Sequence, residues 1–142
     1  MHHLHPFGFC PVVLRLDGPL IDVGVSVPKA YVPWGGPPGT WKSLIDTGAD
    51  MTAISPNVVA ALKPMRIGTA PVGRPGGGRV MCDTYDVRIR FGGHALSGRW
   101  FNLEAVEVPP ATAGVDVLIG MELLLQIDMT WFGPRRLLLL SY

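Results

Sequence analysis

The chain has 142 residues, of which 48% are hydrophobic and 16% charged, and its formal net charge is +1 at pH 7. This length suits one domain of ordinary size and is too short for two similar lobes. A nearly neutral chain has no field that would gather nucleic acid or an anionic membrane surface, so neither is an expected partner. The 18 glycines and 14 prolines favour short strands and tight turns over long helices. We therefore expect a single all-β domain.

The sequence carries no signal for export or membrane insertion. Residues 1–6 lack a positive segment followed by an apolar stretch, and no apolar run approaches the roughly 20 residues that span a bilayer. The two cysteines, Cys10 and Cys82, are too few for a disulfide framework and lack metal-ligand spacing, so we expect reduced thiols. These features predict a cytoplasmic protein without a metal or another cofactor, although a missing precursor segment would change the compartment.

The first half of the chain reads as strands around loops, with residues 1–11 as a partly disordered N-terminal arm and residues 12–142 as the domain. Apolar patterning predicts strands over residues 12–16 and 20–27, a turn at residues 17–19, a loop over residues 28–40 and a strand over residues 41–45. Ser55-Pro56 supplies an N-cap and a first helical position for a short helix that ends near Lys63, before Pro64.

The second half begins with a long hairpin over residues 65–91, whose tip is rich in glycine. Further strands are predicted near residues 101–105, 115–119, 130–132 and 137–142, with a helix over residues 121–127. The terminal segments 7–16 and 137–142 are apolar enough to need covering, which suits strands that interleave at a dimer interface.

The most informative segment is Leu44-Ile45-Asp46-Thr47-Gly48-Ala49, because Asp-Thr-Gly occurs only once in the chain. Ordinary residue usage would produce this tripeptide in about three of a hundred chains of this length, so its context matters. It follows an apolar strand, and 74 residues later Val117-Leu118-Ile119-Gly120 leads into a predicted helix. Two ordered signatures are hard to obtain by chance.

These two signatures resemble those of the retropepsin-like aspartic proteases, a family of bacterial and retroviral type, over roughly residues 20–142. The resemblance implies a closed acid-protease β-barrel with one or two short helices. It also implies a homodimer, because each subunit of such enzymes supplies one catalytic aspartate, here Asp46. The implied activity is that of an aspartic endopeptidase, a hydrolase that cuts an extended peptide or protein substrate by proteolysis.

The chemistry agrees with this requirement for two aspartates. Two carboxylates held close together share one proton, so one acts as acid and the other as base around a single water. The resemblance gives Thr47 a hydrogen bond across the two-fold axis and lets Gly48 admit the substrate backbone. Ala49 lacks the hydroxyl that often follows in pepsin-like enzymes, which predicts activity at mildly rather than strongly acidic pH.

The resemblance also assigns a flap and a second signature. The flap would close over the peptide with the hairpin tip, made of Val72, Gly73, Arg74, Pro75, Gly76, Gly77 and Gly78, and the second signature is Leu118, Ile119 and Gly120. Two departures from the viral pattern stand out. Arg74 and Arg79 flank the tip, and Met121 replaces an arginine that pairs with the acid matching Asp50, so the dimer must be held differently or more weakly.

Several alternatives remain beside this interpretation. Asp46 could cap a turn in a structural barrel, and the protein could be a noncatalytic dimeric module that binds extended peptides or a peptidase that only releases itself from a precursor. Residues 35–43 lack the Gly-Lys-Ser spacing of a phosphate loop. The histidines at positions 2, 3 and 5 suit an unstructured terminus better than a metal site. Asp116 and Asp128 lack an Asp-Thr-Gly setting and are poor candidates for a second catalytic carboxylate.

Overall fold

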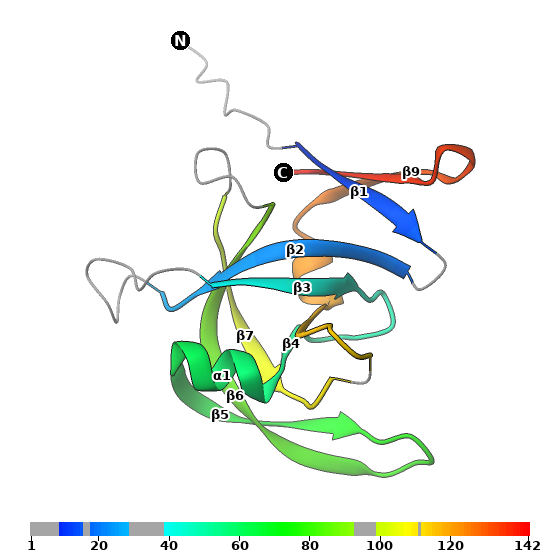
Figure 1. Cartoon of the computed structure of the whole chain (residues 1–142). Helices are drawn as coiled ribbons and strands as arrows, with labels where there is room; N and C mark the ends of the chain where they lie inside the picture. The colour runs from blue at the N-terminus through cyan, green and yellow to red at the C-terminus, as the bar shows by residue number, and fades with distance from the viewer. Residues whose placement is uncertain (1–8, 16–17, 29–38, 93–98, 111) are drawn as a thin grey trace.

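The computed structural model describes residues 9–15, 18–28, 39–92, 99–110 and 112–142 (Figure 1). These residues are mostly β, with two helices and one short 3-10 turn. The strands are β1 Phe9–Arg15, β2 Gly18–Ser26, β3 Gly39–Ile45, β4 Ala53–Ile54, β5 Met65–Gly73, β6 Arg79–Phe91, β7 Phe101–Glu107, β8 Val117–Ile119, β9 Asp128–Phe132 and β10 Leu137–Ser141. The helices are α1 Pro56–Leu62 and α2 Met121–Leu124, and the 3-10 turn is Gly133–Arg135.

The ten strands lie in one sheet in the order β5-β6-β7-β4-β8-β3-β2-β1-β10-β9. An additional pairing joins β2 to β6, from Val23 opposite Phe91 to Ser26 opposite Arg88. Hydrogen-bonded pairs therefore lead from β2 through β3, β8, β4, β7 and β6 back to β2. The strands β5 and β9 are the two ends of the order, and each pairs with one neighbour in the described part of the chain.

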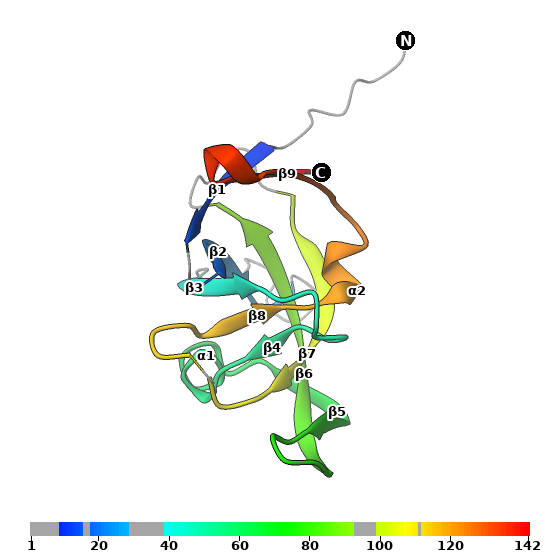
Figure 2. The ribbon, with the colours of Figure 1, turned by 90° about the vertical axis from the view of Figure 1, so that its right-hand side faces the viewer.

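The strands near the two termini pair with each other within one chain. β1 is antiparallel to β10, and β10 is antiparallel to β9. Figures 1 and 2 show this group at one end of the molecule, opposite the tip of the β5–β6 hairpin. The apolar residues Val12, Leu138 and Leu140 are buried here, so part of the covering that we expected from a second subunit comes from the chain itself.

One main hydrophobic core lies between these strands and the helices. It contains the alternating residues Val23 and Val25 of β2 and Val87 and Ile89 of β6, all fully buried. The alternation of β2 was expected, but the opposite face is covered as well, because Ser26 and Gly24 are also buried. A smaller cluster under the hairpin joins Ala53, Ala70 and Val106.

The first helix confirms its prediction closely. Ser55 is the N-cap, its hydroxyl accepts a hydrogen bond from the Val58 N–H at 3.4 Å, and Pro56 is the first helical residue. Lys63 ends the helix in the left-handed conformation with φ 48°. The hairpin is confirmed too, since β5 and β6 pair from Met65 opposite Asp86 to Gly73 opposite Arg79.

Some boundaries differ from the sequence prediction. β1 begins at Phe9 rather than residue 12, and Gly18 and Pro19 start β2 instead of forming a turn. The α2 helix has four residues rather than seven, because the Gln126 and Ile127 N–H groups bond to Leu123 and Leu124, three residues back, as the chain turns toward β9. Two parts of the sequence prediction lie outside the described residues. They are residues 1–8, which include the three N-terminal histidines, and most of the predicted loop over residues 28–40. Within the described ranges no helix is long and apolar enough to cross a membrane.

Candidate active site

Asp46 lies directly beyond the end of β3, next to the second signature. β3 runs parallel to β8, with Leu44 opposite Leu118 and Ile45 opposite Ile119. The Asp46 N–H then donates to the Ile119 carbonyl at 3.0 Å. Parallel strands end at the same edge of a sheet, so the two signatures, 74 residues apart in sequence, meet at one place.

The loop after β3 is folded tightly around the Asp46 carboxylate. The Gly48 N–H donates to Asp46 Oδ1 at 2.9 Å, and the Ala49 N–H donates to the Asp46 carbonyl at 3.3 Å. The Asp46 side chain is half-buried, whereas Thr47 and Gly48 are exposed. The carboxylate is thus held by its own loop and remains partly exposed.

The beginning of α2 fixes the far side of the same loop. The Met121 N–H donates to the Ala49 carbonyl at 2.8 Å, and the Glu122 N–H donates to the Asp50 carbonyl at 3.2 Å. Met121 lacks a cationic side chain, but its backbone makes a contact to this loop. The first turn of a helix has free N–H groups, which here serve the loop carbonyls.

Thr52 and Glu122 complete this attachment, and sequence reasoning missed their roles. The Thr52 N–H donates to Glu122 Oε1 at 2.6 Å, and the Gly120 N–H donates to the Thr52 hydroxyl at 3.0 Å. Thr52 is fully buried. A Cβ on Gly120 would lie 2.4 Å from the Met51 carbonyl carbon, so the close approach of the two segments requires glycine. Sequence reasoning identified Met121 as a departure from the viral pattern and gave no role to Glu122 beside it.

The inner face of the β5–β6 hairpin packs against the segment that follows Asp46 and against the second signature. Val72 and Cys82, which is a free and half-buried thiol, pack with Met51 and Leu118 around the small cluster under the hairpin. The opposite face is open to solvent, with Met81 60% exposed. The inner face of the hairpin, the segment after Asp46 and the second signature therefore share one apolar cluster. The figure of the whole chain shows the hairpin tip and the end of β3 on the same, right-hand side (Figure 1).

The tip of the hairpin has few restraints. Its turn is closed by the Arg74 N–H, which donates to the Gly78 carbonyl at 3.0 Å, and by the Gly77 N–H, which donates to the Arg74 carbonyl at 3.1 Å. Gly76, Gly77 and Gly78 have φ of 86°, 101° and 82°, a region that favours glycine. Nothing lies within 4 Å of a Cβ built on any of these three residues. Such a tip can change conformation without disturbing the core.

Two other acidic residues, Asp116 and Asp128, make contacts that belong to the fold. Asp116 accepts hydrogen bonds from the Ser55 hydroxyl at 2.7 Å and from the Asn57 amide at 3.3 Å, so it holds the start of α1. Asp128 begins the edge strand β9 and pairs with Ser141. Asp116 therefore contributes to the attachment of α1 to the start of β8.

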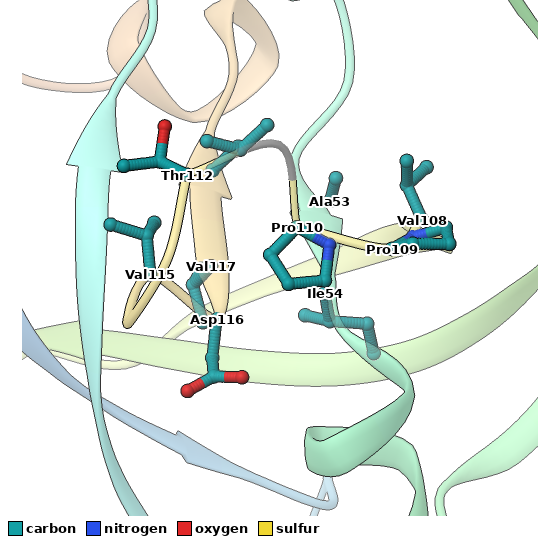
Figure 3. A pocket seen from close by; sticks show the side chains of 10 residues that line it. Ala53, Ile54, Val108, Pro109, Pro110, Thr112, Val115, Asp116 and Val117 are labelled. Atoms are coloured by element: carbon teal, nitrogen blue, oxygen red, sulfur yellow. The ribbon is translucent and has the colours of Figure 1, made fainter.

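A small apolar hollow near α1 is not a ligand site of useful size. It is lined by residues of β4 and of the segment around Pro109, Pro110, Val115 and Val117 (Figure 3). Its volume of about 10 Å³ holds at most one water. Among the described residues, no group of three His, Cys, Asp or Glu side chains could hold a metal ion.

Comparison with known proteins decides the family. The family model described as aspartyl protease matches residues 34–123, which is well over half of the chain and includes both signatures. The chain belongs to the aspartyl protease family. No curated protein sequence matches it.

The fold of the chain is also similar to that of a solved protein structure. The structure of a retropepsin-like aspartic protease from Rickettsia conorii is similar, with a TM-score of 0.58 over 96% of this chain and 92% of that chain. The sequence identity is 18%, so this likeness concerns the fold alone. The resemblance to retropepsin-like proteases drawn from the two signatures is confirmed.

Proposed function

We propose that this member of the aspartyl protease family is an aspartic endopeptidase whose catalytic residue is Asp46. The observation that carries the proposal is the junction at the end of β3, where the Asp46 N–H donates to Ile119 and the half-buried carboxylate is oriented by the Gly48 N–H at 2.9 Å. A side chain held in this way, at the surface of a rigid sheet edge, is preorganised for acid–base chemistry.

The active unit in this proposal is a homodimer with one Asp46 from each subunit. The chain has a single Asp-Thr-Gly, and its Thr47 and Gly48 are exposed, as residues that meet a second copy would be. In each subunit the circuit of strand pairings from β2 back to β2 would be the closed barrel that the family resemblance implies.

The edge strand β9 suits the contact between the two copies. All five of its residues are exposed, including Met129 at 41%, Trp131 at 62% and Phe132 at 36%. An apolar edge strand left open to water promotes pairing with another chain. The interface would therefore use β9, beside the terminal strands that we expected from the sequence.

The mechanism follows from two carboxylates at close range. They share one proton, because both cannot be ionised when they are adjacent. The ionised Asp46 takes a proton from a water as that water attacks the peptide carbonyl, and the protonated Asp46 of the other subunit donates to the carbonyl oxygen. The first Asp46 then passes its proton to the amide nitrogen as the C–N bond breaks, and the second takes back a proton from a hydroxyl of the intermediate as the carbonyl reforms, which restores the shared proton. Thr47 and Gly48 would support the loops, and no covalent intermediate or cofactor takes part.

The substrate in this proposal is an extended peptide held under the hairpin. The residues from Val72 to Gly78 would form the flap, since nothing lies within 4 Å of a Cβ built on the glycines of the tip and the inner face of the hairpin packs near Met51 and Leu118. Backbone groups of the flap would hold the peptide as an added strand and exclude water.

The decisive experiment is cleavage of a diverse peptide library, read by mass spectrometry from acidic to neutral pH, with the wild type and Asp46→Asn in parallel. We expect cuts with a mildly acidic optimum that vanish in the variant. Wild-type cuts that persist in Asp46→Asn would refute the catalytic assignment, and a strongly acidic optimum would contradict the expected effect of Ala49.

A demonstrated dimer that makes no cuts would favour the noncatalytic peptide-binding module. An N-terminally extended chain should then be assayed, because a peptidase that only releases itself would still process that chain. If it too stays intact, the endopeptidase proposal fails.

The dimer can be tested separately by Trp131→Asp, measured by sedimentation velocity and by activity at several protein concentrations. We expect dissociation and a loss of activity that high concentration partly restores. Met81→Asp is the matched control, because Met81 is equally exposed but lies on the outer face of the hairpin. A monomeric and fully active wild type would exclude the two-subunit site.

A further inference from the structure

Two arginines and a tryptophan form a cationic cluster far from Asp46. The Arg88 guanidinium carbon lies 4.4 Å from the centre of the Trp100 ring, and that of Arg90 lies 4.8 Å from it. Arg88 and Arg90 stand on the same face of β6, the face opposite the core residues Val87 and Ile89.

Strand register places this cluster at the end of the sheet remote from the catalytic loop. Arg90 is opposite Gly24 on β2, and Gly24 is opposite Thr40 on β3. Asp46 lies six residues beyond Thr40 along β3, which corresponds to about 20 Å. The Arg88–Arg90–Trp100 cluster is therefore a different place from the site proposed for catalysis.

The two guanidinium groups have no acidic partner among the described residues. Arg88 is only 7% exposed, and its one hydrogen bond there is from Nη2 to the Ser26 hydroxyl, at 3.5 Å. The Nε atoms of Arg88 and of Arg90 are both buried without a hydrogen-bond partner.

The local electrostatics agree with a shortage of negative charge. Burial, and then the positive charge of Arg90, lower the pKa of Arg88. Burying a cation is costly unless an anion accompanies it, so the buried Arg88 guanidinium, beside the unpaired Nε of Arg90, favours an anion from solution.

Because Gly24 has no side chain, the Arg90 and Trp100 side chains can lie close to β2. A Cβ at this position would lie 3.1 Å from Arg90 Nε and 3.6 Å from the Trp100 ring. A larger residue would push both side chains away from β2. Even a Cβ here would require the Arg90 side chain to shift slightly, so glycine favours its observed position.

We propose that Arg88 and Arg90, beside Trp100, form a binding site for a phosphate dianion, either free phosphate or a phosphate monoester. Two neighbouring guanidinium groups match a charge near −2, and their planar N–H forks suit phosphate oxygens. The Trp100 ring contacts both guanidinium groups through cation–π interactions, which hold the two cations next to each other. Arg90 and Trp100 are partly exposed, so the anion can reach the cluster from solution.

The test is isothermal titration calorimetry of the full chain with inorganic phosphate, and with acetate at the same ionic strength. We expect phosphate to bind and acetate to bind much more weakly. Arg90→Gln should weaken phosphate binding by about tenfold, since it removes one charged donor group. Arg135→Gln, which changes an exposed arginine in the 3-10 turn, should leave the affinity unchanged. Circular dichroism of each variant verifies that it is folded.

Three results would overturn the proposal: no phosphate binding by the wild type, an equal loss in both arginine variants, or acetate binding as tight as that of phosphate. A further titration with phenyl phosphate separates the two sources of the anion. Tighter binding than that of inorganic phosphate supports a phosphorylated ligand, whereas equal or weaker binding supports free phosphate.

Discussion

The loop from Asp46 to Thr52 and the hairpin tip from Gly73 to Gly78 are restrained in opposite ways. The loop is attached to residues 119–122 by backbone hydrogen bonds and by the Glu122 carboxylate. The tip is closed by hydrogen bonds of its own turn, and nothing lies within 4 Å of a Cβ built on any of its four glycines. A reacting group needs a fixed position, and a closing segment needs freedom to move. In the proposed function the loop is the rigid element and the tip is the mobile element, and the small apolar cluster under the hairpin connects them through Met51 and Val72.

The largest effect is expected at the rigid element, from Asp46→Asn. Loss of the acid–base group should lower kcat/KM by about 10³-fold or more. The free energy of unfolding should change little, because the carbonyl oxygen of Asn can still accept from the Gly48 N–H. Peptide cleavage and urea denaturation measured on the same sample test both statements, and retained activity would show that the loop is only structural.

Gly120→Ala should damage the attachment of the loop. Its Cβ would meet the Met51 backbone at 2.4 Å, so we expect a loss of about 2–3 kcal/mol in the free energy of unfolding. Gly73→Ala is the matched control in the hairpin, where nothing lies within 4 Å of the new Cβ. If urea denaturation gives the same loss in the free energy of unfolding for both variants, the loop is not packed more tightly than the hairpin.

Glu122→Ala should have a smaller effect at the same place. It leaves the buried Thr52 N–H without its acceptor, which we expect to cost about 2 kcal/mol of stability. Glu122→Gln keeps an oxygen acceptor and should recover much of that loss. If the two variants unfold at the same urea concentration, the hydrogen bond to Thr52 contributes nothing measurable.

The smallest change in stability is expected in the mobile element. Gly77→Ala places a side chain at φ 101° in an open turn, and we expect a loss of about 1 kcal/mol in the free energy of unfolding. The same change should lower kcat/KM about fivefold if the tip closes over substrate. An unchanged kcat/KM in a folded variant would remove the hairpin from the proposed mechanism.

Features encoded by neighbouring residues were predicted well from the sequence. The α1 helix begins and ends where Ser55, Pro56 and Lys63 indicated, because capping is local. The β5–β6 hairpin was also predicted, since its strands are adjacent in sequence and its tip is rich in glycine.

Features that depend on distant contacts were predicted less well. The seven residues expected for the second helix became four, because the chain must turn after the buried Leu123 and Leu124 and leave Leu125 77% exposed. The roles of Thr52 and Glu122 could not be read from the sequence, since 70 positions separate the two residues that share the hydrogen bond. The terminal strands were expected at a dimer interface, and their pairing within one chain was not foreseen.

The sequence by itself determined the family, because Asp46-Thr47-Gly48 and Leu118-Ile119-Gly120 are local patterns whose residue types follow from the chemistry. The tertiary structure alone decided how the two patterns meet. The parallel pairing of β3 with β8 brings Asp46 to Ile119, and the Glu122 carboxylate then fixes the loop through Thr52. A parallel pair joins segments far apart in the chain, so its partners and register arise only when the whole sheet forms.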